Sequence, residues 1–252
     1  MKLLIPVKRV PDPDTTIKLT SDGSSIVTDH VSFVISQLDE IALEEALRIR
    51  EARGDESEIV AVSIGGEEVG EQIRTALAMG ADRGLFVRVE EPLDPHMVAT
   101  ILTKVVEREG PDLIIMGKQS PEDDSTQVGQ LLAEHLGWPQ ATFLAKLTLA
   151  DDLASAVCER EVDGGIETIR VELPAVFTAD VRLNEPRYAS LPMIMKARGK
   201  PIDEVGLDEL GVAYAPLQHI HGLELPPARK GGVMVEGVQE LMEKLRNEAK
   251  VL

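Results

Sequence analysis

The feature that most constrains the fold of this chain is the repeated alternation of short apolar runs with amphipathic segments over its first two-thirds. The apolar runs predict buried strands at Lys2–Pro6, Glu58–Ile64, Gly84–Val89 and Asp112–Met116. Apolar residues at helical spacing predict helices at Asp39–Arg53, Val69–Met79, Asp94–Glu109 and Ser125–Leu136. Tandem β-α units with short connections predict an α/β fold with a doubly wound, mostly parallel sheet.

The pattern changes in the second half of the chain. Shorter β-like runs follow one another at Leu144–Ala150, Ala154–Arg160, Thr168–Leu173 and Ala175–Ala179. Between two of them, Asp163, Gly164 and Gly165 predict a hairpin turn. We therefore expect a β-hairpin region to be added to the parallel sheet.

The chain beyond Val181 is irregular. Pro186, Pro192 and Pro201 exclude one long helix, although Leu191–Arg198 is suited to a short one. A final amphipathic helix carries an apolar stripe formed by Val238, Leu241, Met242 and Leu245. We expect an α/β core over residues 1–181, a loop over 182–201 and a C-terminal arm over 202–252. Long arms without a core of their own usually pack on another surface.

Charge and composition exclude several classes of function. The chain has 26 Lys and Arg against 44 Asp and Glu, a net charge of −18, whereas nucleic acids and anionic membranes attract basic surfaces. Aromatic residues make up 3%, too few for a carbohydrate platform or a base-stacking surface. Cys158 is the single cysteine, so an intrachain disulfide or a cysteine zinc cluster is impossible. The apolar runs are too short to span a membrane, and the N-terminal one is too short for a signal peptide.

The first candidate site is the segment GKQSPEDDST, Gly117–Thr126, between a predicted strand and a predicted helix. Ligands of open α/β sheets bind beyond the carboxyl ends of the strands, where helix N-termini present free amides. Ser125 and Thr126 offer hydroxyls and first-turn amides to a phosphate, whereas Glu122, Asp123 and Asp124 repel an anion unless they point away. The spacing is not that of a P-loop, and an ordinary capped loop is the alternative.

Other strand ends would line the same crevice. Pro6 ends the first predicted strand, Ser36–Asp39 precede the first long helix, and Gly65 and Gly66 follow Ile64. The two glycines allow a base or ribose to approach the backbone, or they form an ordinary tight turn. No Ser-His-Asp order with an elbow motif occurs, and no carboxylate pair is marked out by its surroundings. We therefore expect a chain that binds a ligand without performing acid–base catalysis.

The third candidate is the segment Arg182–Lys200. Leu183, Tyr188 and other apolar residues alternate there with cations, although the protein is strongly acidic. Arg and apolar anchors are typical of binding hot spots, so the segment predicts a docking surface. The alternative is that Leu183 and Tyr188 cover the sheet, and we expect both interpretations to hold in part.

The run REVDGGIETIRVELPAVFTADVRLNEPRYASLPMIMKARGKP, Arg160–Pro201, resembles the signature region of the electron transfer flavoprotein β subunit. The resemblance extends, in collinear order, through VKRV (Val7–Val10), DEIALEEALR (Asp39–Arg48), IRTALAMGADRG (Ile73–Gly84), GKQSPEDDSTQ (Gly117–Gln127) and LGWPQATF (Leu136–Phe143). It covers nearly the whole chain, and the composite is far more specific than any of its pieces.

The resemblance implies an adenine-nucleotide-binding α/β fold and a heterodimer with a larger α subunit that carries redox-active FAD. It implies electron transfer from acyl-CoA dehydrogenases or similar flavoenzymes to a membrane quinone oxidoreductase, with structural AMP in β and no catalytic residues in β. By position, it assigns AMP contacts to Pro6, Ser36, Gln37, Leu38, Asp39, Ile64, Gly117, Lys118, Gln119, Ser120, Asp123, Asp124, Ser125, Thr126, Gln127 and Val128.

The resemblance also implies a surface for partner proteins. Leu191 corresponds to the apolar anchor for partner dehydrogenases, within a recognition loop that includes Arg187, Tyr188, Met195 and Lys196. Glu161 corresponds to an acid that helps to position the mobile flavin domain. The C-terminal arm would pack on the α subunit.

The sequence departs from the family in a few places. Some members have aromatic residues near Pro13 and Leu38 that face the flavin of α, and many have Asn-Pro where this chain has Ser36 and Gln37. The acidic run before the helix resembles the AMP-binding, non-bifurcating type. The alternative within the family is an electron-bifurcating subunit in which FAD bound to β oxidises NADH.

A stand-alone nucleotide-binding protein ranks last, since it would need neither recognition loop nor arm. No transit peptide is visible, so the expected location is a bacterial or archaeal cytoplasm rather than the mitochondrial matrix.

Overall fold

The computed structural model describes residues 1–228 and 231–252, which divide into two compact units. The first unit comprises Met1–Ile17 and Val27–Ile220, and the second comprises Lys18–Ile26 and His221–Leu252. The first unit contains the large sheet and the helices around it, and we describe each unit by itself.

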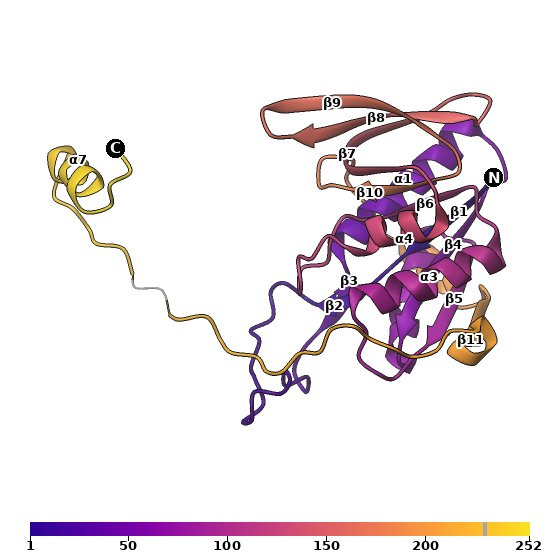
Figure 1. Cartoon of the computed structure of the whole chain (residues 1–252), viewed down its shortest axis with the longest axis horizontal. Helices are drawn as coiled ribbons and strands as arrows, with labels where there is room; N and C mark the ends of the chain where they lie inside the picture. The colour runs from indigo at the N-terminus through magenta and orange to yellow at the C-terminus, as the bar shows by residue number, and fades with distance from the viewer. Residues whose placement is uncertain (229–230) are drawn as a thin grey trace. The chain divides into compact units, whose positions relative to one another are not determined.

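A nine-stranded sheet forms the centre of the first unit, in the order β11-β5-β4-β1-β6-β10-β7-β8-β9 (Figure 1). The strands from β11 to β7 pair in parallel, and β8 and β9 continue the sheet antiparallel. Their bounds are β1 Lys2–Pro6, β4 Glu58–Gly65, β5 Arg83–Arg88, β6 Leu113–Gly117, β7 Gln140–Leu149, β8 Ser155–Val162, β9 Gly165–Glu172, β10 Ala175–Ala179 and β11 Ile202–Gly206. The predicted α/β class and mostly parallel sheet are confirmed.

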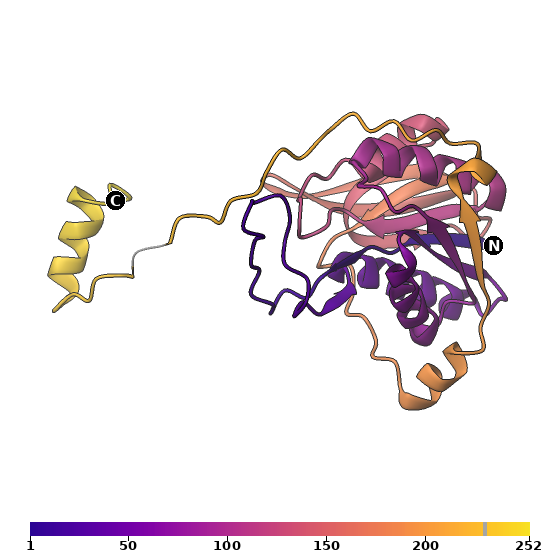
Figure 2. The same ribbon diagram turned by 90° about the horizontal axis from the view of Figure 1, so that it is seen from below.

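Helices cover both faces of the parallel strands (Figure 2). Helices α1 (Gln37–Arg53) and α2 (Gly70–Met79) pack on one face, and α3 (Pro95–Glu109) and α4 (Val128–Leu136) pack on the other. Along β1, Leu3 and Ile5 belong to the first core layer and Leu4 to the second, and all three are fully buried. A strand covered on both sides must be apolar throughout, which is why these strands are continuous apolar runs in the sequence.

The added β-hairpin is confirmed. Strands β8 and β9 are in register from Ser155 opposite Glu172 to Val162 opposite Gly165, so Asp163 and Gly164 form the turn. Strand β10 then returns to the middle of the sheet, parallel to both β6 and β7. This return was not predicted, because a local pattern does not show which neighbours a buried strand pairs with.

Two short strands outside the large sheet were also not predicted. Strands β2 (Arg9–Pro11) and β3 (Phe33–Ile35) pair antiparallel with each other in a separate two-stranded sheet. Each has three residues, too few for a periodic signal.

The predicted helix Ser125–Leu136 begins later than expected. Asp124 and Thr126 have φ angles of 48° and 53°, in the left-handed region, so the helix begins after them, at Val128. Ser125 and Thr126 are therefore loop residues and not the first turn of α4.

The C-terminal arm predicted from residue 202 begins with part of the core. Ile202–Gly206 forms the edge strand β11, parallel to β5, and α6 (Leu207–Leu210) follows it. The short helix expected near Leu191 is α5 (Leu191–Ala197).

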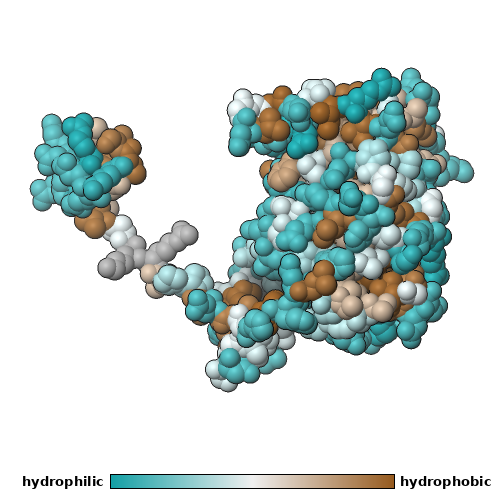
Figure 3. Space-filling view, viewed as in Figure 1, coloured by the Kyte–Doolittle hydropathy of each residue, from teal (hydrophilic) through white to brown (hydrophobic). Residues whose placement is uncertain are grey.

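The second unit contains the last predicted helix, α7 (Val238–Asn247). Apolar side chains gather on one side of this helix and hydrophilic ones on the other (Figure 3). Val238, Leu241 and Met242 are exposed, and α7, which lies wholly in the described part of the chain, has no buried residue. Among the described residues, no helix is both long and apolar enough to cross a membrane.

Candidate functional site

A pocket of about 420 Å³ opens at the carboxyl ends of β1, β4, β5 and β6. Strand β1 lies between β4 and β6, so the chain reverses its direction of winding at β1. Such a reversal leaves a crevice at the carboxyl edge, where open α/β sheets bind their ligands. The volume lies within the roughly 300–1,000 Å³ typical of small-molecule sites.

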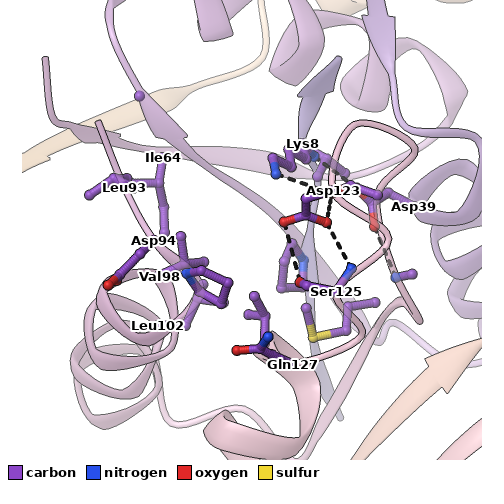
Figure 4. A pocket seen from close by; sticks show the side chains of 18 of the residues that line it. Lys8, Asp39, Ile64, Leu93, Asp94, Val98, Leu102, Asp123, Ser125 and Gln127 are labelled. Carbon is purple, nitrogen blue, oxygen red and sulfur yellow. Dashed lines mark hydrogen bonds between the residues drawn. The ribbon is translucent and has the colours of Figure 1, made fainter. Parts of the chain in front are cut away.

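The pocket has an apolar side and a polar side (Figure 4). Its mainly apolar side is formed by Ile64, Leu93, Val98 and Leu102, with the carboxylate of Asp94 beside them. Its polar side is formed by Lys8, Asp123, Ser125 and Gln127. This arrangement suits a ligand with a flat apolar ring at one end and a hydrogen-bonding group at the other.

The acidic side chains of the loop before α4 are hydrogen-bonded or ion-paired within the protein. Asp123 accepts hydrogen bonds from the amide and the hydroxyl of Ser125, at 3.1 and 3.3 Å. Glu122 forms an ion pair with Lys8, and Asp124 Oδ1 accepts a 2.8 Å hydrogen bond from Gln119 Nε2. Each of the acids expected to repel an anion therefore has a donor from the protein itself.

The end of this loop is strained, and the helix that follows it has an uncapped start. Thr126 is β-branched and has a φ of 53°, an uncommon combination that concentrates at functional sites. No side chain of the described residues caps α4, and its first residues, Val128 and Gly129, line the pocket. Free first-turn amides and the helix dipole make such a start an anion-binding site.

Asp39 links two of the strand ends that surround the pocket. Its Oδ2 accepts the amide of Lys8 and its Oδ1 accepts the amide of Gly117, both at 2.9 Å, so one carboxylate joins the ends of β1 and β6. Burial raises the pKa of Asp39 to about 7, against the opposing effect of these two amides. Position 117 must be glycine, because a Cβ there would lie 2.6 Å from Asp39 Oδ1.

The cations near the pocket are already paired. Lys118 Nζ is 2.7 Å from Asp180 Oδ2 and lies over the ring of Phe143, and Lys8 is paired with Glu122 as described above. Among residues 1–228 and 231–252, no group of three His, Cys, Asp or Glu side chains converges as a metal site would require. The polar side therefore presents mainly amides and hydroxyls, with its two lysines already paired.

A family model described as "Electron transfer flavoprotein domain" matches residues 24–210 of this sequence. The chain belongs to the electron transfer flavoprotein family. It is 50% identical to the electron transfer flavoprotein subunit beta of Bradyrhizobium diazoefficiens over 252 residues, and 49% identical over 252 residues to the mitochondrial subunit beta of Arabidopsis thaliana. It is 45% identical over 255 residues to the human subunit beta. Each match covers 100% of this chain and 99–100% of the relative, which confirms the β-subunit resemblance.

The pocket brings together most of the residues predicted to bind a cofactor. Those that line it are Pro6, Asp39, Ile64, Gly117, Lys118, Gln119, Ser120, Asp123, Ser125, Thr126, Gln127 and Val128. Ser36, Gln37, Leu38 and Asp124 are not among its lining residues. The hydroxyl of Ser36 is buried and has no hydrogen-bond partner among the described residues.

The apolar wall contributed by α3 was missed. Val98 and Leu102 are four residues apart on one helix face, as core residues are, so periodicity does not separate a pocket wall from a core. Lys8 was missed as well, although its place two residues beyond the first strand was a usable signal.

The recognition segment is exposed at its apolar residues. Tyr188, Leu191 and Met195 are 98%, 71% and 56% exposed, and Lys196 is also exposed, whereas Leu183 packs against the core. Arg187 forms ion pairs with Glu44 and Glu51 of α1. Glu161 on β8 forms an ion pair with Arg182 at the start of the segment.

Proposed function

We propose that this chain is the β subunit of a heterodimeric electron transfer flavoprotein that binds AMP as a structural nucleotide and works with FAD held mainly by the α subunit. In this function the heterodimer accepts electrons from acyl-CoA dehydrogenases or similar flavoproteins and passes them to a quinone oxidoreductase. The observation that carries the proposal is the pocket at the β1–β6 switch point, with an apolar wall facing the uncapped start of α4.

The residues of the pocket fit AMP. The amides of Val128 and Gly129 and the hydroxyls of Ser125 and Thr126 would hold the phosphate, and Ile64, Val98 and Leu102 would contact the adenine. The volume of about 420 Å³ is sufficient for a mononucleotide.

The redox chemistry would come from FAD in α, and this chain would provide a scaffold and a docking surface. Arg182, Lys196 and Arg198 are exposed in the same segment of the chain as the apolar residues of α5. An apolar anchor would enter a pocket on the partner, and the cations would steer an acidic partner surface toward it.

The test is an electron transfer assay on the heterodimer co-produced with its α subunit. We expect an acyl-CoA dehydrogenase with its substrate to reduce the flavin, and a quinone oxidoreductase to reoxidise it. Rapid flavin reduction by NADH, without any dehydrogenase, would instead support the bifurcating alternative.

A further inference from the structure

The segment that carries the exposed apolar residues is fastened to the core at both of its ends. Helix α5 has seven residues, of which Ala197 alone is buried, and isolated helices shorter than about 12–15 residues are marginal in water. Its geometry therefore depends on the flanking residues. These flanking residues are distinct from Leu191, the proposed apolar anchor.

The first attachment is made by Arg187, directly before the exposed Tyr188. Glu44 accepts hydrogen bonds from Arg187 Nε at 2.7 Å, from Nη2 at 3.1 Å and from the backbone amide at 3.2 Å. Glu51, further along the same helix, accepts from Nη1 at 2.5 Å and from Nη2 at 3.0 Å. The guanidinium is thus held by two carboxylates of α1, and its planar fork is fixed in direction as well as position.

Glu44 is built for this contact. It is 3% exposed, and its second oxygen also accepts a 2.9 Å hydrogen bond from Arg48. Burial opposes ionisation of Glu44, but the hydrogen bonds from Arg187 and Arg48 outweigh it and lower its pKa. Asn184, a few residues earlier, adds hydrogen bonds to the carbonyl of Ile41 at 3.0 Å and to Glu45 at 2.9 Å.

The second attachment joins the other end of α5 to α2. Arg74 Nη1 donates to the carbonyls of Ala197 and Lys200, at 2.9 and 2.6 Å. Lys200 Nζ in turn donates to the carbonyls of Leu77 and Ala81, at 3.0 and 2.5 Å. In both attachments charged side chains donate to carboxylate or backbone oxygens across the contact between segment and scaffold, and the exposed apolar helix lies between the two attachments.

We propose that Arg187, held by Glu44 and Glu51, and Arg74 are positioning residues that keep α5 in the geometry its partner binds. This rests on the proposed function, which makes α5 a docking helix for flavoprotein dehydrogenases. Arg187 then acts through α5 and not as a contact of the partner, which revises the role that the resemblance assigns to it. A helix that is ordered before binding loses less conformational entropy when the partner binds, so affinity depends on residues the partner does not touch.

The test uses the α–β heterodimer and an acyl-CoA dehydrogenase whose reaction reduces its flavin. Arg187→Gln should raise the KM for the heterodimer about tenfold and leave kcat and FAD content unchanged. Hydrogen exchange of the α5 amides should become faster in the same variant without the partner, while exchange in the strands stays as in the wild type. Arg187→Lys, which keeps the charge without the fork, should recover part of the KM.

Two further variants make the result interpretable. Arg187→Gln leaves the buried Glu44 with Arg48 as its one remaining cation among the described contacts. Glu51→Gln, which loosens the exposed half of the attachment, should therefore give a smaller change in the same direction. Arg53→Gln breaks a surface ion pair with Asp55 at the end of the same helix and should leave KM and α5 exchange unchanged.

Faster α5 exchange together with a raised KM supports the proposal. Unchanged hydrogen exchange of α5 in Arg187→Gln overturns the proposal. If the KM of that variant is also unchanged, Arg187 has no role in docking. If its KM is raised, Arg187 contacts the partner directly. The Leu191→Ala variant distinguishes a failure of the positioning role from a failure of the proposed function. If Leu191→Ala leaves KM unchanged, docking through α5 is wrong, whereas a raised KM in that variant with no effect of Arg187→Gln overturns only the positioning role.

Discussion

Asp39 shows how one side chain can connect the fold to the site. Its carboxylate accepts the amide of Lys8, just after β1, and that of Gly117, the last residue of β6, and a glycine at position 117 leaves room for this contact. The sequence placed Asp39 at the crevice only as part of the stretch before a helix. Its buried position and its two amide partners depend on strands more than a hundred residues apart.

The raised pKa of Asp39 predicts a pH dependence of stability. Burial raises it from 3.8 to about 7, so between these pH values the folded protein holds a proton that the unfolded chain has released. The contribution of this group to the free energy of unfolding is therefore full below pH 3.8 and is lost as the pH rises through 7. Urea unfolding of the heterodimer at a series of pH values should show this slope as a difference between the wild type and Asp39→Asn. The control variant Asp163→Asn, in an exposed turn, should show the wild-type dependence of the unfolding free energy on pH. A wild-type dependence in Asp39→Asn would contradict the prediction.

Ser125 and Thr126 lie at the strained end of the loop before α4. The double substitution to Ala should lower the AMP retained by the heterodimer and weaken its assembly, since each neutral hydrogen bond contributes about 0.5–1.5 kcal/mol. Flavin reduction by dithionite should be unaffected, because these residues do not touch the flavin in our account. Nucleotide released per heterodimer after gel filtration is the measurement, and full retention of AMP would remove both hydroxyls from the site.

At the scale of elements, the sequence predicted what depends on local periodicity. The four β-α units, the β8–β9 hairpin, α5 and α7 were all expected, within a few residues of their observed bounds. The predicted start of α4 at Ser125 was wrong, because the sequence does not reveal the positive φ angles of Asp124 and Thr126. The positions of β10 and β11 in the sheet were not predicted, because they depend on pairing between distant parts of the chain. The pocket wall at Val98 and Leu102 was missed because its spacing is that of ordinary core residues.

Leu191 tests the docking role of α5. It is the first residue of that helix and is 71% exposed, so removing its side chain should cost the isolated heterodimer little stability. Leu191→Ala should weaken the affinity for the partner dehydrogenase by about 1–3 kcal/mol, the range for burying one Leu. Steady-state kinetics with the dehydrogenase, alongside thermal unfolding, is the measurement. A fall in stability that accounts for the whole loss would return Leu191 to a structural role.

At the scale of the whole molecule, charge and exposed apolar surface indicate a chain made for assembly. The net charge of −18 makes the cations of the recognition segment a local exception. The stripe of Val238, Leu241 and Met242 on α7 is exposed within its own unit, and such surfaces usually mark interfaces.

Deleting Glu236–Leu252 should therefore reduce co-purification of this chain with the α subunit. The deletion removes α7 and leaves every strand of the large sheet in place, so circular dichroism should show little change in strand content. Undiminished co-purification of the shortened chain would contradict an interface role for α7.

The most direct test of the central claim is to identify the nucleotides in the purified heterodimer. The protein is denatured, and the released molecules are identified and counted by mass spectrometry. We predict one AMP and one FAD per heterodimer, with less AMP retained when Ser125 and Thr126 are both replaced by Ala. Two FAD per heterodimer without AMP, or FAD alone with an empty pocket, would contradict the assignment of this site to AMP.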